Sequence, residues 1–224
     1  MKGKLVDLSY TLRPGAESRL LEIELLQASQ VNVHAKVMPG QWYVMHNMRL
    51  VSHLGTHIES PYHINRDGAD VARVPLDSVI GDAVVLDLRG SAPREEIGLA
   101  KVQSAAEKAG GIRPGDLVLL FTGWDVHYDT PEYGRSPYPS PEAVEWLVGQ
   151  GVKMIGIDTG GAEVPGSEEH VNHHAMLDRG VPHIENLRNL GALTKSRVFL
   201  MAAPLAMERM ESMPLRVVAL ESED

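Results

Sequence analysis

The chain has 224 residues, of which 43% are hydrophobic and 23% are charged, so it can bury the core of a globular domain. Its formal net charge is −9 and its lysines and arginines form no run, which argues against binding to nucleic acid or to anionic membranes. The absence of cysteine excludes disulfides, thiolate metal ligands and a cysteine nucleophile.

The first residues lack the apolar stretch of a signal peptide, and no apolar run approaches the roughly 20 residues that span a bilayer. Together with the missing cysteines, these features favour a cytoplasmic protein. The chain contains no internal repeat and no Gly/Ser linker. We therefore expect residues 1–224 to form a single domain.

Short apolar runs bounded by Gly, Pro or Asp predict strands along the whole chain. These runs are Lys4–Leu8, Val31–Val37, Ala83–Leu88, Leu117–Thr122, Met154–Ile157 and Arg197–Met201. Their apolar character is continuous rather than alternating, which is typical of strands buried on both faces.

Helices are predicted between the later strands: Lys101–Ala109, from Ser140 to about Val148, and from about Glu169 to Asp178. The second has the clearest start, with Ser140 as the N-cap and Pro141 at the first helical position. Strands that alternate with helices predict a layered α/β domain, in which the early segments could pair antiparallel.

Histidines are concentrated in one short segment that holds His53, His57 and His63, with Glu59 between them. Divalent metals such as zinc take imidazole and carboxylate ligands, commonly three from the protein in catalytic sites. His53, His57 and Glu59 supply such a set, and Gly55 favours a tight loop rather than a helix. The alternative is a polar loop with incidental histidines.

His63 is left over from this set, and a neutral imidazole beside a metal site can act as a general acid and base. A second group downstream contains His173 and Glu185, which are too distant in sequence for local contact unless the chain folds back. Taken alone, this pair is weak evidence for a metal site, because helix-face histidines and a glutamate after a turn are common.

The segment His53–His63 matches the pattern His-x-Gly-Thr-His-x-Asp-x-Pro-x-His, apart from Glu59. The chain therefore resembles the cyclase family of metal hydrolases, which includes bacterial kynurenine formamidase (arylformamidase) and isatin hydrolase. Further similarity lies in Asp7–Ser9, Pro114–Trp124, Gly156–Thr159, Ile184–Leu187 and Met213–Ala219. The resemblance implies a compact α/β fold with a mixed β-core and flanking helices, usually assembled as homodimers or homotetramers.

The resemblance also implies roles for the clustered residues. His53, His57 and the carboxylate of Glu59 would hold a first ion, and Glu59 would bridge to a second ion held by His173 and Glu185. His63 matches the acid/base histidine of the family. Zinc suits these ligands best and manganese is the alternative, with one or two ions per chain.

Two departures from the family pattern affect the substrate and the ions. Glu59 reaches one methylene further than the usual Asp, and Arg13–Ala16 occupies the region where the formamidases carry a Trp. The absence of that Trp argues against kynurenine formamidase activity itself. The residues Trp42, Tyr43, Tyr62 and Trp124 could line a different pocket, or serve as core or interface packing.

We therefore expect a hydrolase that cleaves an amide, imide or lactone bond of a small molecule by metal-activated water, with His63 as acid/base. Asp158 and Thr159 could orient the ligands, or simply cap a strand end. A Ser/His/Asp hydrolase is disfavoured because no Gly-x-Ser-x-Gly motif is present. The alternative from another class is a metal- or ligand-binding protein without turnover.

Overall fold

The computed structural model describes residues 3–223, within which a mixed nine-stranded sheet has the order β1-β13-β11-β5-β7-β9-β10-β4-β12. Its strands are β1 (Gly3–Asp7), β4 (His57–Glu59), β5 (Ile80–Asp87), β7 (Leu117–Phe121), β9 (Met154–Ile157), β10 (His183–Glu185), β11 (Arg197–Met201), β12 (Ser212–Pro214) and β13 (Val218–Ser222). The central strands β5, β7, β9 and β10 are parallel, and every other pair in this sheet is antiparallel. The expected α/β fold with a mixed β-core is confirmed.

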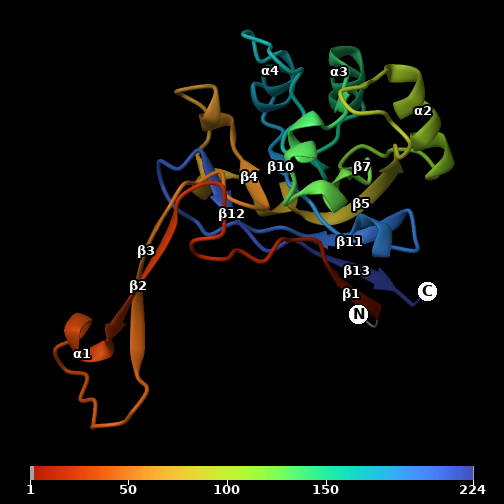
Figure 1. The fold of residues 1–224 in the computed structure, drawn as a ribbon. Coiled ribbons are helices and arrows are strands. Elements are labelled where there is room, and N and C mark those ends of the chain that lie inside the picture. Colours follow the sequence, from red (N-terminus) through yellow and green to blue (C-terminus); the bar gives the residue numbers. More distant parts are fainter. Residues whose placement is uncertain (1–2, 224) are drawn as a thin grey trace.

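Three helices, α2 (Leu99–Lys108), α3 (Pro141–Gly149) and α4 (Val171–Leu177), gather on one side of the central strands (Figure 1). The predicted N-cap is confirmed, because the Ser140 side chain accepts a hydrogen bond from the backbone N–H of Ala143. Short 3₁₀ segments lie at Pro61–His63, Val71–Arg73, Leu76–Ser78, Trp124–His127, Pro131–Arg135 and Leu190–Ala192, and β6 (Glu96–Ile97) pairs with β8 (Tyr138–Pro139).

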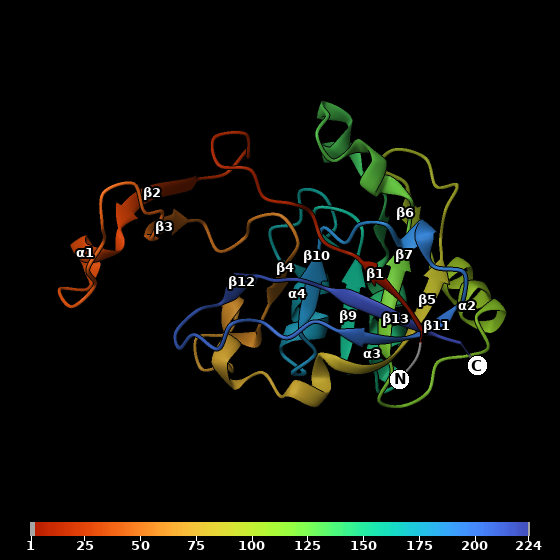
Figure 2. The same ribbon diagram turned by 90° about the horizontal axis from the view of Figure 1, so that it is seen from below.

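The central strands are buried on both faces, as their continuous apolar character predicted. In β5, Val84 and Leu86 pack under the helices, whereas Ala83 and Val85 face a second core on the other side of the sheet. This alternation follows from the period of two along a strand. The structure thus has two apolar layers, and the outer strands β1, β13 and β11 close over the second one (Figure 2).

A hairpin arm formed by β2 (Leu21–Gln27), α1 (Ala28–Val31) and β3 (Val44–Leu50) extends away from the body in both views (Figures 1 and 2). The predicted strand Val31–Val37 is wrong. These residues lie at the tip of the arm, where Val33 is 87% exposed, so the apolar run has no neighbouring strand to pair with and no core to enter. The strands β2 and β3 were not predicted.

The remaining predicted elements are found within a few residues of their expected bounds, and the strands Met154–Ile157 and Arg197–Met201 have the bounds predicted. The predicted third helix is shorter than expected and begins at Val171. Among the described residues, no helix is long and apolar enough to cross a membrane.

Candidate metal centre

The histidine-rich segment turns sharply before it enters the sheet. Gly55 has φ +54°, a left-handed conformation that glycine adopts readily, so the tight loop expected around it is present. The strand β4 then begins at His57, whose Nδ1–H donates a hydrogen bond to the Gly55 carbonyl at 2.8 Å. This bond keeps a proton on Nδ1, so a His57 ring that releases its other proton can bind a cation through Nε2.

Glu59 lies at the centre of the cluster, with its side chain only 3% exposed. Its Oε1 atom is 2.9 Å from His53 Nδ1 and 3.9 Å from His63 Nε2, and its Oε2 atom is 3.2 Å from His173 Nε2. The longer side chain of glutamate therefore reaches imidazoles from both the local segment and α4.

The chain folds back so that the downstream pair joins this cluster. His57 Nε2 lies 3.3 Å from Glu185 Oε2, and His173 Nε2 lies 3.9 Å from Glu185 Oε1. The structure thus brings together all six residues singled out from the sequence: His53, His57, Glu59, His63, His173 and Glu185.

Three further residues contribute to the cluster and were missed by sequence reasoning. Glu163 accepts a hydrogen bond from His173 Nδ1–H at 2.8 Å, and Glu211 Oε1 lies 3.4 Å from His53 Nε2. His183 is fully buried beside Glu185. No local signal marks Glu163 or Glu211, because both reach the site from distant loops. A local sequence signal does mark His183, since His-Ile-Glu occurs both at residues 57–59 and at residues 183–185.

The buried charges determine the protonation of the cluster without an ion. Burial alone would lower the pKa of His57 and of His173, but contacts with Glu185, Glu163 and Glu59 raise these pKa values to about 9 and about 10. Burial raises the pKa of Glu59, but the surrounding histidines outweigh it and hold that pKa well below its usual range. Glu59 is therefore ionised and holds cationic partners around it.

Several buried atoms of this cluster lack a hydrogen-bond partner within residues 3–223, namely His57 Nε2, Glu59 Oε2 and His183 Nε2. Buried polar atoms are normally satisfied, so the convergence of these atoms fits a shared cation. The candidate ligand atoms of His53, His57 and Glu59 also lie within 4.8 Å of one another. Imidazole nitrogens and carboxylate oxygens are the donors that a divalent ion such as zinc takes, so the residues fit an ion.

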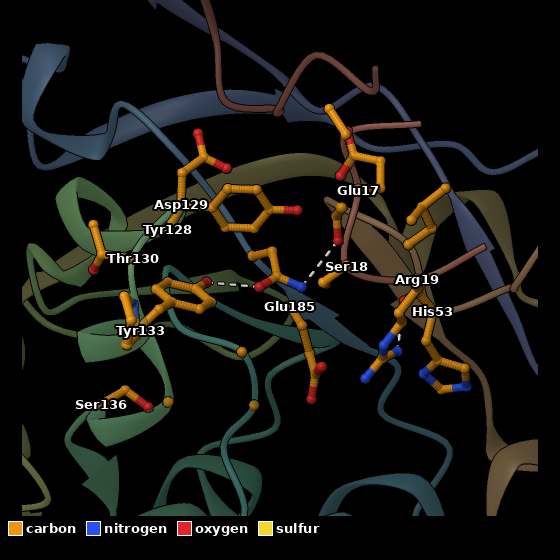
Figure 3. A pocket seen from close by; sticks show the side chains of 18 of the residues that line it. Glu17, Ser18, Arg19, His53, Tyr128, Asp129, Thr130, Tyr133, Ser136 and Glu185 are labelled. Carbon is orange, nitrogen blue, oxygen red and sulfur yellow. Dashed lines mark hydrogen bonds between the residues drawn. The ribbon is translucent and has the colours of Figure 1, made fainter. Parts of the chain in front are cut away.

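A cavity of about 820 Å³ opens beside the cluster and is lined by His53, Glu163 and Glu185 (Figure 3). One wall is held by a chain of hydrogen bonds in which the Tyr133 hydroxyl donates to Asn186 Oδ1 and Asn186 Nδ2 donates to the Gly55 carbonyl. Burial raises the pKa of Tyr133, so its hydroxyl stays protonated and able to donate.

The aromatic residues suggested for a pocket do not line this cavity. Trp42 and Tyr43 are exposed on the hairpin arm, and Trp124 is buried as core packing. Tyr128 and Tyr133 line the cavity instead, together with Arg13 from the region where the formamidases carry a Trp.

Asp158 acts at a strand end rather than at the cluster. Its buried carboxylate accepts hydrogen bonds from the backbone N–H and hydroxyl of Thr122 and from the Gly123 N–H, at 2.6–3.1 Å. These bonds tie the end of β9 to the end of β7. These contacts favour a role for Asp158 in capping the strand end over a role in orienting the ligands.

Comparison with known proteins places this geometry in a family. Residues 6–164 match the Cyclase family model. The chain is 31% identical to kynurenine formamidase of Erythrobacter litoralis over 206 residues, which cover 90% of this chain and 87% of that protein. It is also 31% identical to kynurenine formamidase of Salinibacter ruber over 182 residues, 80% of each chain.

A solved structure agrees with the sequence matches. Isatin hydrolase A from Ralstonia solanacearum superposes with a TM-score of 0.83 at 26% identity, covering 98% of this chain and 92% of that one. Both the family model and the kynurenine formamidases match most of the chain, including the segment His53–His63. This chain is therefore a member of the Cyclase family.

Proposed function

We propose that this protein is a metal-dependent hydrolase that cleaves an amide, imide or lactone bond of a small molecule. The observation that carries the proposal is the convergence of His57 Nε2 and Glu59 Oε2, which are buried and lack a hydrogen-bond partner among the described residues. The relatives named kynurenine formamidase and isatin hydrolase support the same class of reaction.

The ligand assignment follows the distances within the cluster. His53, His57 and Glu59 would hold a first ion, and His173 and Glu185 would hold a second one together with Glu59. Zinc matches a donor set rich in imidazole, and manganese is the alternative. A bound ion of this kind lowers the pKa of water and polarises a carbonyl oxygen.

The position of His63 and the direction of its pKa shift support a role as acid/base. Its side chain is 30% exposed, more than those of the proposed ligands, and its Nε2 atom lies 3.9 Å from Glu59 Oε1. Burial lowers the pKa of His63, so the imidazole is neutral near pH 7 and able to accept a proton. It then returns that proton to the departing nitrogen or oxygen.

The hairpin arm supports a homo-oligomer. On one face of the arm, Ile23 is paired with Met48 and Leu25 with His46, and the apolar side chains are 44–68% exposed. The opposite face carries Glu22, Glu24 and Arg49. An isolated hairpin is marginally stable in water, so an apolar face of this kind needs a cover. We propose that a second copy of the chain supplies it.

The experiment that tests the function compares the wild-type protein with His57→Ala. Metal content is measured per chain after purification without a metal-affinity tag, and hydrolysis is assayed with cyclic amides, imides, lactones and N-formyl anilines. We expect one or two equivalents of zinc or manganese in the wild type and loss of both metal and turnover in the variant. A folded wild type that binds no ion after reconstitution would contradict the proposal.

A further inference from the structure

The two strands at the centre of the cluster carry the same tripeptide. His57-Ile58-Glu59 forms β4 and His183-Ile184-Glu185 forms β10. The strands are antiparallel, and their register places His183 opposite Glu59 and Glu185 opposite His57. Each strand therefore presents a histidine to the glutamate of the other.

Strand alternation separates the apolar and polar residues of this pair. Ile58 and Ile184 both enter the core on one side of the sheet. The histidines and glutamates point to the other face, where α4 brings His173. The result is a nearly symmetric polar patch with two cross-strand histidine–glutamate pairs, His57–Glu185 and His183–Glu59. Of these four residues, only His183 lies outside the ligand set assigned above.

The tautomer of His183 is fixed by its own backbone contact. Its Nδ1–H donates to the Ile155 carbonyl at 2.8 Å, so its Nε2 carries a lone pair and can only accept. That Nε2 atom is fully buried, has no hydrogen-bond partner within residues 3–223 and lies 3.8 Å from Glu185 Oε1.

His183 Nε2 and the Glu185 carboxylate are two hydrogen-bond acceptors that face each other in a buried site. They repel each other unless a positive charge lies between them. An ionised carboxylate accepts only, so Glu185 cannot satisfy the His183 lone pair by itself. His173, whose ring centroid is 6.2 Å from that of His183, directs its Nε2 towards the same carboxylates. A cation bound between His183 Nε2 and these carboxylates would remove the repulsion between the acceptors.

We propose that His183 Nε2 is a further nitrogen ligand of the second ion, alongside His173 and Glu185. This inference rests on the proposed metal-dependent function and adds a donor that the resemblance to the family did not assign. With two imidazoles, the second site prefers zinc or cobalt over manganese or magnesium, because nitrogen donors suit the former and oxygen donors the latter.

The test is a metal titration of the chelator-treated protein with Zn²⁺ and with Co²⁺, followed by calorimetry and by the visible absorption of Co²⁺. The informative variant is His183→Asn, because an asparagine amide can still donate to the Ile155 carbonyl but offers no atom in place of Nε2. His174→Asn is the matched control, since His174 is an exposed neighbour on α4 that pairs with Asp178.

We expect two ions in the wild type and in the control, and one tight ion in His183→Asn with the second weakened at least about tenfold. Two wild-type-like sites in His183→Asn, or a single wild-type site unaffected by it, would overturn the role of His183 and leave the proposed function standing. A wild type that binds no ion would contradict both the role of His183 and the proposed function.

A crystal structure of the zinc-loaded wild type keeps the inference testable if His183→Asn does not fold. The expected distance from His183 Nε2 to the second ion is about 2.0–2.1 Å. A nitrogen beyond about 3 Å from any ion would overturn the assignment, since zinc–imidazole bonds are far shorter.

Discussion

The Oε2 atom of Glu59 lies 3.2 Å from the Nε2 atom of His173, so a single carboxylate links the local histidine segment to α4. Its other oxygen faces His53 at 2.9 Å. This position between the two groups supports the bridging role proposed for Glu59.

Replacing Glu59 with glutamine should therefore weaken both ions together. The amide loses the negative charge and one of the two acceptor oxygens, so we expect at least about a hundredfold loss of affinity in a Zn²⁺ titration, more than a single outer contact would cost. Glu169→Gln, at an exposed position near the start of α4, is the control. Loss of only one ion would show that Glu59 does not bridge.

His63→Ala should separate binding from turnover. Because His63 is proposed to move protons and not to hold an ion, we expect hydrolysis to fall about 10²–10⁴-fold while metal content stays at the wild-type level. His34→Ala, which alters an exposed residue of the arm, serves as the control. Unchanged turnover in His63→Ala would remove its acid/base role.

The metal-free protein should lose stability in alkaline solution. His57 and His173 have pKa values of about 9 and about 10 in the fold, above the ordinary value of 6.5 that applies in the unfolded chain. Their contribution is complete below about pH 6.5 and is lost as the pH rises through about 9 and 10. Urea denaturation in the presence of a chelator, repeated between pH 6 and 10, measures this contribution. A free energy of unfolding that is constant or rises over that range would contradict the proposed pairing of these histidines with the buried carboxylates.

Metal binding should have the opposite dependence on pH. Both imidazoles must release their protons to coordinate an ion, so affinity should rise with pH over the same range and binding should release protons. Calorimetry in buffers of different ionisation enthalpy measures the number released.

Asp158→Ala should cost stability without emptying the metal site. Removing this carboxylate leaves the buried N–H groups of Thr122 and Gly123 without an acceptor, and we expect a loss of about 3 kcal/mol in the free energy of unfolding. Asp178→Ala, at an exposed position, should change it by less than about 0.5 kcal/mol. Loss of metal from folded Asp158→Ala would instead connect Asp158 to the site.

Met48→Glu should dissociate the proposed oligomer. It introduces a charge on the apolar face of the arm, next to Ile23, where the proposed second copy would bury it. Light scattering after size exclusion should show a monomer, whereas Met45→Glu on the opposite face should keep the wild-type mass. A wild type that is already monomeric would contradict the proposed oligomer, and a Met48→Glu oligomer would place its interface elsewhere.

The sequence was informative wherever burial leaves a continuous apolar run. Met154–Ile157 was predicted with its observed bounds because β9 is buried on both faces. Arg197–Met201 also has the bounds predicted, although only alternate residues of β11 are buried. The same reasoning failed at Val31–Val37, where apolar residues are exposed on the arm. The pattern alone cannot tell a residue that enters the core from one that faces solvent or a second chain.

The site was predictable only as far as its motif extended. His53–His63 marked the cluster, but β4 and β10 are three-residue strands, too short to show a period. Their pairing, which brings Glu185 to His57 and His183 to Glu59, is a property of the sheet order. Glu163 and Glu211 reach the histidines through tertiary folding alone, so no spacing rule could identify them.

The position of β4 between β10 and β12 has a consequence for biosynthesis. Both neighbours of β4 come from the last part of the chain, Ser212–Pro214 on one side and His183–Glu185 on the other. While the ribosome is still translating the middle of the protein, the segment His53–Glu59 has neither strand partner nor the downstream carboxylate. The complete centre can assemble only once the C-terminal segment has emerged, so an ion captured by the nascent chain would be held by the early residues His53, His57 and Glu59 alone.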